Sequence, residues 1–273
     1  MGRALMKDAA AEHAASDVQA SLVSEGTEVM IVRHGRTTWN EEGRIQGSGD
    51  APLTEAGEIE AVRLGERLAM GLGRKPTVCY SSPLRRATRT AEILCGHLGL
   101  QICVEEDLRE RAYGCLEGLT SEEQKAQHPE AHKRNRARED EYEIPGGGES
   151  RANARKRVLA VIKRIALRHA GQRVLIVTHS GVLSTLATTL IGAKVNAGRP
   201  GPVLPNVAIN LFRWQGGSEG GWQLVLWGDK GDFACETPLA GQSYRPYWSL
   251  AACTGLAFVA GAFAGSRLRS ITP

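Results

Sequence analysis

Residues Val29 to Gly35 have the sequence VMIVRHG, in which four apolar residues lead directly into Arg33, His34 and Gly35. The apolar run predicts a buried strand, and the three residues after it then lie at the strand's carboxyl end. Ligands bind at that end of the strands in open α/β sheets. Arginine offers a fork of donors that suits phosphate or carboxylate, and histidine is a nucleophile or proton carrier near neutral pH. Glycine lets the backbone approach a ligand closely. The stretch therefore predicts an anion-handling site at the edge of a sheet.

A second continuous apolar run, Val174–Thr178, also ends in a histidine, His179. The carboxyl ends of parallel strands lie at the same edge of a sheet. We therefore expect His34 and His179 to share one pocket. A single histidine in such a place is more often structural, but two in matching contexts favour a functional site.

A third predicted strand, 77–81, brings two arginines to the same edge. We expect a helix to follow from Ser82-Pro83 to about Cys95, with the proline in its first turn. Arg85 and Arg86 then lie near the start of this helix, where the dipole and the free N–H groups favour an anion. This position makes both arginines candidates for binding a ligand.

Strands alternate with helices along the chain, which predicts an α/β fold: a three-layer α/β/α sandwich with a mostly parallel central sheet. The predicted helices span 55–70, 82–95 and a long segment after 148, and later strands are expected over 208–213 and 222–227. Residues 121–143 carry both charge signs in near balance, so we expect a solvated helical excursion and not a nucleic-acid patch.

The composition fits one globular domain with tails. Of 273 residues, 42% are apolar and 23% charged, and the net charge of +4 is too mild to argue for nucleic acid. The cysteines are scattered, with no C-x-x-C pair and no clustering with histidine: Cys79, Cys95, Cys103, Cys115, Cys235 and Cys253. This pattern argues against a disulfide framework and a structural metal site, and it fits a reducing compartment such as the cytoplasm.

The two ends of the chain differ from the predicted domain, 27–240. Residues 1–26 are rich in alanine, carry both charge signs and lack the apolar core of a secretory signal, so we expect a disordered leader. Residues 246–266 contain no charged side chain and match the length that crosses a bilayer. Two interpretations stay open: a tail anchor on an organelle membrane facing the cytosol, or an Ala/Gly-rich helix packed on the domain. The oligomeric state also stays open, with a homodimer among the alternatives.

An ordered set of motifs resembles the histidine phosphatase superfamily, also called phosphoglycerate-mutase-like, and most of all its plant-type phosphatases. The matching elements are Arg33-His34-Gly35, Thr37-x-Trp39-Asn40, Gln46-Gly47, Leu53-Thr54-x-x-Gly57, Ser82-Pro83-Leu84-x-Arg86-Ala87-x-x-Thr90, Leu108-x-Glu110-x-x-x-Gly114, Gly148-Glu149-Ser150 and Val177-Thr178-His179-Ser180-Gly181. They extend over most of the chain except its tails. The resemblance implies the phosphoglycerate-mutase-like fold.

The resemblance also implies catalytic roles. His34 is the expected nucleophile, which takes the phosphoryl group as a phosphohistidine. Arg33, Arg86 and His179 are expected to bind the phosphoryl oxygens, and Glu110 to act as general acid and then base. No metal or cofactor is required by this residue set. Four further residues are expected to bind the substrate: Asn40, Gln46, Gly47 and Ser180.

The motifs decide two assignments that residue chemistry leaves open. Glu110 lies in an acidic stretch with Glu105, Glu106 and Asp107, and only the L-x-E-x-x-x-G match selects it. The second motif likewise favours Arg86, which directly precedes alanine, over its neighbour.

Two positions depart from the family pattern. Arg36 stands where glutamate or glutamine is usual, as an extra cation beside the pocket or a solvent-facing side chain. Ser180 stands where glycine is usual, a change that is tolerated if its φ is not positive.

Phosphatases and cofactor-dependent mutases both occur in this family. The mutase pattern has a lysine where this chain has Thr120-Ser121, and an asparagine at the place of Gly181, whereas Tyr113 is shared with the mutases. We therefore predict a phosphatase of a small phosphorylated metabolite, with loop 121–145 as its specificity lid. The alternatives are a phosphoglycerate mutase, a phosphoprotein phosphatase and an inactive membrane-anchored binding protein. The complete catalytic set favours an enzyme.

Overall fold

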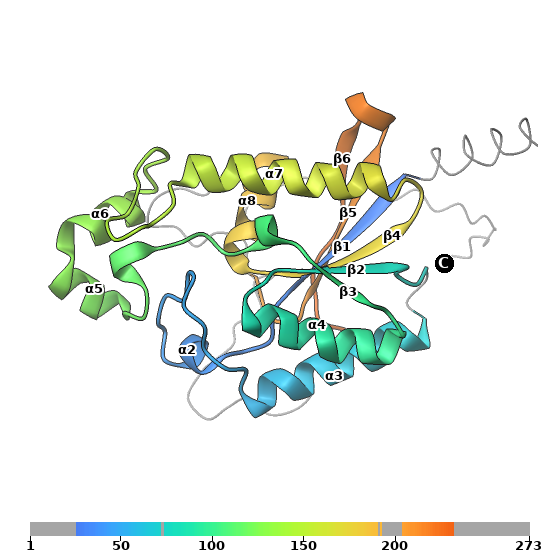
Figure 1. The fold of residues 1–273 in the computed structure, drawn as a ribbon, viewed down its shortest axis with the longest axis horizontal. Coiled ribbons are helices and arrows are strands. Elements are labelled where there is room, and N and C mark those ends of the chain that lie inside the picture. Colours follow the sequence, from blue (N-terminus) through green and yellow to red (C-terminus); the bar gives the residue numbers. More distant parts are fainter. Residues whose placement is uncertain (1–25, 72–73, 191, 193–203, 232–273) are drawn as a thin grey trace, which may run out of the picture. The chain divides into compact units, whose positions relative to one another are not determined.

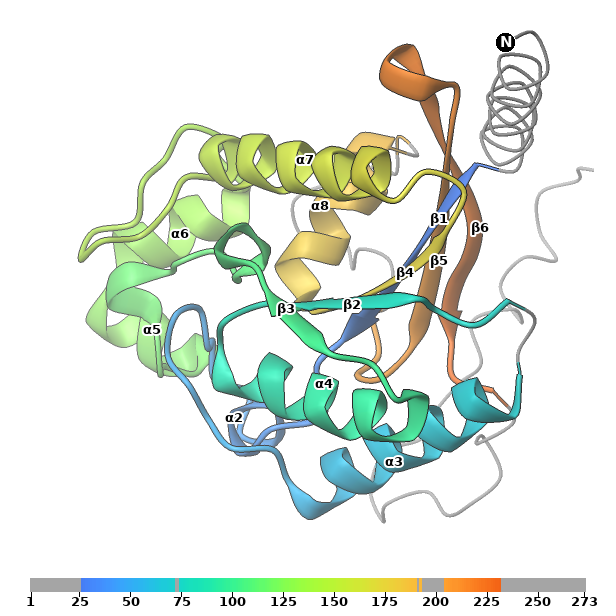
Figure 2. The same ribbon diagram turned by 45° about the vertical axis from the view of Figure 1, so that its right-hand side comes forward.

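The computed structural model describes residues 26–71, 74–190, 192 and 204–231. They contain a six-stranded sheet (Figures 1 and 2). Its strands are β1 (Thr27–Arg33), β2 (Val78–Ser81), β3 (Ile102–Val104), β4 (Arg173–Thr178), β5 (Ile209–Gln215) and β6 (Gly221–Asp229). The spatial order is β3-β2-β4-β1-β5-β6, in which the first four run parallel and the last two are antiparallel to their neighbours. This confirms the predicted α/β fold with a mostly parallel sheet.

Strands β1 and β4 are the two central strands of the sheet, and both are buried over nearly their whole length. Their parallel register pairs Val29 with Val174 and continues to Arg33 beside Thr178. Both strands therefore end at the same level, which brings His34 and His179 to one edge. The backbone N–H of His34 also donates to the carbonyl of Thr178 at 2.9 Å.

Helices cover both faces of the sheet, as Figures 1 and 2 show. Alternate residues of β1 point to opposite faces. Met30 and Val32 belong to a hydrophobic cluster with α3 (Glu55–Met70) and α4 (Arg85–Leu98). Val29 and Ile31 belong to another with α7 (Arg151–Arg168) and α8 (Ser180–Leu190). The main apolar side chains of the helices are Leu64, Leu68, Ala91 and Leu94 on the first face, and Val158, Ile162, Ile165, Leu183 and Leu186 on the second.

The start of α4 corrects the sequence prediction. The helix begins at Arg85, so Pro83 precedes it and does not lie in its first turn. The carboxylate of Asp50 accepts hydrogen bonds from the backbone N–H groups of Arg85 at 2.7 Å and Arg86 at 3.2 Å. This side chain, and not a ligand, therefore occupies the anion position at the helix N-terminus.

The charged segment 121–143 forms the predicted helical excursion, with α5 (Ser121–Gln127) and α6 (Pro129–Ala137) beyond the carboxyl edge of the sheet (Figure 1). It is not wholly solvated, because Ala131 of α6 joins Leu116 and Ile144 in a small hydrophobic cluster. The remaining short elements are α2 (Thr38–Glu41), η1 (Glu106–Leu108), η2 (Gly114–Leu116) and η3 (Gly217–Glu219).

The predicted tails fall almost wholly outside the described residues. The expected leader, 1–26, has only Gly26 within them, and 246–266 has none. Within the described ranges, no helix has both the length and the apolar character needed to cross a membrane.

Candidate active site

A cavity of about 170 Å³ lies at the carboxyl edge of the sheet, and we call it the histidine cavity. All predicted site residues except His179 line it, namely Arg33, His34, Asn40, Gln46, Gly47, Arg86, Glu110 and Ser180. His179 lies directly against it, with its ring centroid 5.2 Å from that of His34. The structure thus brings together all the residues that the sequence predicted for the site.

The ring of His34 is held in one tautomer. Its Nδ1 lies 2.8 Å from the carbonyl oxygen of Gly35. A carbonyl oxygen can only accept, so Nδ1 must carry the proton and Nε2 the free lone pair. The side chain is buried, with 3% of its surface exposed. His34 therefore presents a bare Nε2, the form that a nucleophile requires.

His179 is oriented by a residue for which the sequence suggested no role. Its Nε2 lies 2.7 Å from the hydroxyl of Ser82, which follows β2. Its Nδ1 is buried and has no hydrogen-bond partner among the described residues. If the hydroxyl donates to Nε2, the neutral ring carries its proton on Nδ1 and has one donor left for a ligand.

Both imidazoles are neutral near pH 7. Burial, followed by the charges of Arg33 and Arg86, lowers the pKa of His34 well below its ordinary value of 6.5. Burial and the same two arginines, with His34, lower the pKa of His179 well below that value. His34 is therefore unprotonated at neutral pH, the form in which an imidazole has a free lone pair.

These shifts predict a pH dependence of stability. Below pH 6.5 the unfolded chain binds protons at these histidines that the native state cannot bind, so the free energy of unfolding falls as pH drops from 6.5 towards the lowered pKa values. Each histidine contributes up to about 1.4 kcal/mol per pH unit in that window. Urea unfolding between pH 7.5 and 5.5 measures the slope. His34→Gln should reduce it, and an unchanged slope in this variant would contradict the assignment.

Of the arginines that line the histidine cavity, Arg86 is buried and Arg33 is partly exposed. Arg86 donates to the carbonyl oxygens of Gly49 at 2.6 Å and Gly47 at 2.8 Å, and Arg33 donates to that of Leu204 at 2.6 Å. The Nε atoms of both are buried without a hydrogen-bond partner among the described residues. Burial lowers the pKa of both guanidinium groups, but arginine stays charged at neutral pH. The cavity is thus suited to an anion that accepts these remaining donors.

Glu110 lies at the wall of the same cavity. Its Oε1 accepts the backbone N–H of Arg111 at 2.9 Å, and its Oε2 accepts that of Gly181 at 2.9 Å. The hydroxyl of Ser180 lies 3.4 Å from Oε2. A Cβ atom at position 181 would lie 2.0 Å from Oε1, so glycine is needed there to seat the carboxylate. The arrangement fixes a carboxylate at the wall of the cavity that His34 also lines.

The residues that the sequence predicts to bind the substrate have different local contacts. The Oδ1 of Asn40 accepts the N–H of Thr37 at 3.2 Å, which leaves its Nδ2 group for a ligand. The Oε1 of Gln46 is buried without a hydrogen-bond partner among the described residues. Gly47 has a φ of +55°, and a Cβ atom there would lie 2.1 Å from Oε1 of Glu117. Its part in the site is to let the backbone pass close to this carboxylate.

Two further residues hydrogen-bond to the backbone of His34 and Gly35. Thr90 accepts the N–H of Gly35 at 2.9 Å and donates to the carbonyl of Arg86 at 2.7 Å. Asn206 donates to the carbonyl of His34 at 2.8 Å. The threonine closes one of the quoted motifs, so the sequence contained a signal for it. Asn206 lies in no motif, and only the fold brings it to the site.

The structure also shows where three residues lie that the sequence left in question: Arg36, Arg85 and Ser180. Arg36 pairs with Glu60 at 3.5 Å and does not line the histidine cavity. Arg85 pairs with Glu92 at 3.5 Å, and its side chain is largely exposed, which supports the choice of Arg86. Ser180 is not among the described residues with positive φ.

Comparison with known proteins assigns the family. The family described as histidine phosphatase superfamily (branch 1) matches residues 29–230. The chain belongs to the histidine phosphatase superfamily. Within the described residues of this superfamily member, no group of three or more His, Cys, Asp or Glu side chains is placed to hold a metal ion.

Relatives in the superfamily include phosphoglycerate mutase-like protein 4 of Arabidopsis thaliana, which is 38% identical over 74% of this chain and 85% of its own length. A metal-independent phosphoserine phosphatase of the same plant is 38% identical over 76% of this chain and 83% of its own length. Among solved structures, a mycobacterial glucosyl-3-phosphoglycerate phosphatase in complex with VO3 has a TM-score of 0.63 at 30% identity, over 74% of this chain and 99% of the other. The superfamily therefore includes similar proteins named as phosphatases and as mutase-like.

Proposed function

We propose that this chain is a phosphatase that hydrolyses a small phosphate monoester through a phosphohistidine on His34. The observation that carries the proposal is the 2.8 Å contact between Nδ1 of His34 and the carbonyl of Gly35, because it leaves Nε2 bare in a cavity lined by Arg33, Arg44 and Arg86. Arg33 and Arg86 bind the phosphoryl oxygens and stabilise the charge that develops on them during transfer. Nδ1 of His179, which has no hydrogen-bond partner among the described residues, donates to the same group in the tautomer where Ser82 donates to Nε2.

The first step transfers the phosphoryl group to the enzyme. Nε2 of His34 forms the new bond to phosphorus, and the bond from phosphorus to the ester oxygen breaks with its electron pair on that oxygen. Protonated Glu110 gives its proton to the leaving oxygen, so an alcohol departs. The seating of this carboxyl group on the N–H groups of Arg111 and Gly181 keeps it beside the reacting atoms.

The second step releases phosphate. The Glu110 carboxylate takes a proton from water as the water oxygen attacks phosphorus. The bond from phosphorus to Nε2 breaks, and its electron pair returns to His34. Inorganic phosphate leaves, and both side chains regain their starting protonation states.

Two features favour hydrolysis over isomerisation. Thr120 caps α5 by accepting the N–H of Glu123 at 3.3 Å and does not line the histidine cavity, so the place of the mutase lysine supplies no cation there. Gly181 makes room for the carboxylate of Glu110 and offers no side chain to a second phosphate. The similarity to a phosphoserine phosphatase and a glucosyl-3-phosphoglycerate phosphatase supports the same choice. A mutase is the second candidate, because Tyr113 lines the cavity and is shared with that branch.

A parallel assay on the full chain tests the proposal. Phosphate release is measured from phosphoserine, 3-phosphoglycerate, glucosyl-3-phosphoglycerate and a phosphoserine peptide. Isomerisation of 3-phosphoglycerate is measured beside it with 2,3-bisphosphoglycerate present. We expect phosphate release from a small monoester without isomerisation, and no release by the His34→Ala protein. Isomerisation faster than phosphate release would assign the mutase, and release from the peptide alone a phosphoprotein phosphatase. Absence of both activities would leave a binding protein.

A further inference from the structure

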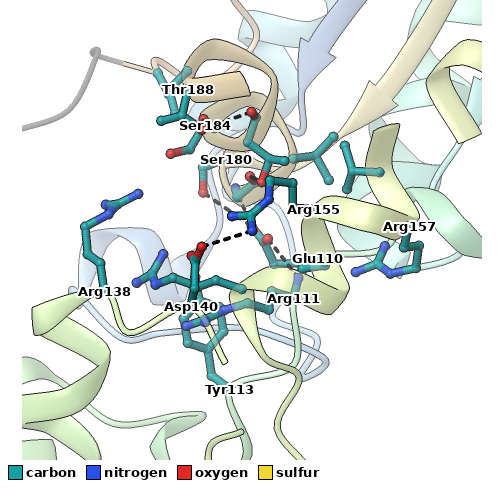
Figure 3. A pocket seen from close by; sticks show the side chains of 17 residues that line it. Glu110, Arg111, Tyr113, Arg138, Asp140, Arg155, Arg157, Ser180, Ser184 and Thr188 are labelled. Carbon is teal, nitrogen blue, oxygen red and sulfur yellow. Dashed lines mark hydrogen bonds and ion pairs between the residues drawn. The ribbon is translucent and has the colours of Figure 1, made fainter. Parts of the chain in front are cut away.

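A second cavity of about 530 Å³ adjoins the histidine cavity, and we call it the distal cavity (Figure 3). Glu110, Tyr113 and Ser180 line both cavities. A ligand whose phosphate lies beside His34 can therefore extend past Glu110 into the distal cavity. The side chains of the distal cavity would then contact the part of the ligand that lies beyond its phosphate.

Two arginines of this cavity share one neutral acceptor. Nη2 of Arg111 donates to Oδ1 of Asn135 at 2.5 Å, and Nη2 of Arg151 donates to the same oxygen at 3.2 Å. Arg151 also donates to the backbone carbonyl of Asn135 at 3.0 Å. The guanidinium of Arg111 lies over the ring of Tyr113, 4.4 Å from its centroid. Two like charges are thus fixed side by side, which costs free energy unless an anion joins them.

Two other arginines of the distal cavity differ from this pair, because each has a carboxylate partner. Arg155 pairs with Asp140 at 2.9 Å, and Arg157 pairs with Glu149 at 2.6 Å. Arg111 and Arg151 have no carboxylate partner among the described residues.

Their electrostatics agree with this contrast. The Nε atoms of Arg111 and Arg151 are both buried without a hydrogen-bond partner in the described part of the chain. Burial, and next the charge of Arg111, lowers the pKa of Arg151 to about 10. Asp140 has a smaller, opposite effect on Arg151 and pairs directly with Arg155. Arg111 and Arg151 therefore hold positive charge without an ion-pair partner of their own among the described residues.

We infer that Arg111 and Arg151 form a second anion subsite, which binds an acidic group of the substrate other than the phosphate that is hydrolysed. The ligand class is a phosphate monoester with a carboxylate or a second phosphate. Hydroxyl side chains of α8, at Ser184 and Thr188, line the same cavity and suit a polar body between the two acidic groups (Figure 3). The inference rests on the proposed function, because it takes the ligand that binds here to be the substrate of the phosphatase.

The test measures equilibrium binding, which needs no turnover. Calorimetry on the His34→Ala protein compares 3-phosphoglycerate with glycerol 3-phosphate, which has a hydroxymethyl group in place of the carboxylate. A second comparison sets fructose 1,6-bisphosphate against fructose 6-phosphate. Each ligand is measured again after adding Arg151→Gln, Arg151→Lys or Arg111→Gln. The double variant Arg155→Gln/Asp140→Asn is the matched control, because it removes an arginine of the same cavity together with the carboxylate that pairs with it.

We expect Arg151→Gln and Arg111→Gln each to raise the dissociation constant of the doubly acidic ligand about tenfold or more. This is the usual effect of losing a hydrogen bond to a charged group. Binding of the ligand without the second acid should stay unchanged, and Arg151→Lys should restore part of the loss. The Arg155→Gln/Asp140→Asn control should leave the binding of both ligands unaffected. If only 3-phosphoglycerate loses affinity, the subsite binds a carboxylate. If only fructose 1,6-bisphosphate loses affinity, the subsite binds a second phosphate.

If Arg151→Gln weakened the binding of the ligands with and without the second acidic group equally, the subsite would be overturned. The arginine would then be a structural support of α6. Unchanged binding of both doubly acidic ligands in the Arg151→Gln and Arg111→Gln proteins would also overturn it. Failure of the proposed function is a separate result, because it would appear as absent phosphate release by the unmodified chain while the binding difference persisted.

Discussion

Replacing His34 with alanine is expected to lower kcat for phosphate release by at least about a thousandfold, because the variant has no atom that can form the covalent intermediate. Water cannot substitute well, since it lacks the fixed position that the contact to Gly35 gives to Nε2. Chain folding should persist, because the ring makes one side-chain hydrogen bond and the surrounding backbone bonds to Thr178 and Asn206 do not involve it. Steady-state phosphate release measures the loss.

Trapping of the intermediate sharpens this prediction. A rapid quench with radiolabelled substrate should give an acid-labile, base-stable phosphoprotein in the unmodified chain and none in His34→Ala. The control is His97→Ala, which removes an exposed histidine from α4. Label retained by His34→Ala would move the nucleophile elsewhere, and His179 would be the next residue to test.

Glu110→Gln is expected to slow phosphoryl transfer from alkyl phosphates by about 10²- to 10⁴-fold, the range of general acid catalysis. Glutamine keeps an oxygen for the N–H of Gly181 but cannot give a proton to the leaving alkoxide. An aryl phosphate such as p-nitrophenyl phosphate leaves without that proton, so its transfer step should change far less. Single-turnover rates over a series of leaving groups measure the difference.

The second step gives an independent check on Glu110. Because the same carboxylate activates water, the Gln variant should release p-nitrophenol in a burst and then continue slowly. An equal loss for alkyl and aryl phosphates, without a burst, would mean that Glu110 positions the substrate and does not transfer protons. Glu117→Gln changes another carboxylate near the cavity, and it should not change the dependence on the leaving group.

The parts of the site that lie on the central strands could be predicted from residue chemistry alone. Apolar runs ending in His34 and His179 predict parallel buried strands, and parallel strands bring their carboxyl ends together. Glu110 could not be found in this way, because it follows η1 on a loop whose path depends on tertiary contacts. Only the family motif selected it from the acidic residues around it.

Other features required the fold itself. Asp50 precedes α4 by 35 residues, and nothing local in the sequence indicates that its carboxylate caps that helix. Asn206 reaches His34 across 172 residues. The contacts of Asn135 with Arg111 and Arg151 depend on how α6 is placed against the start of α7, which charge patterning does not specify.

The small hydrophobic cluster of Leu116, Ala131 and Ile144 lies apart from the two clusters that hold the sheet and its helices together. The α5–α6 excursion consequently has an anchor of its own, and its polar residues can be exchanged without disturbing the strands beneath His34 and His179. In evolutionary terms, the proposed subsite of the distal cavity can diverge while the residues proposed for phosphoryl transfer are inherited unchanged. A single scaffold can in this way give rise to enzymes that share a nucleophile and differ in what they recognise.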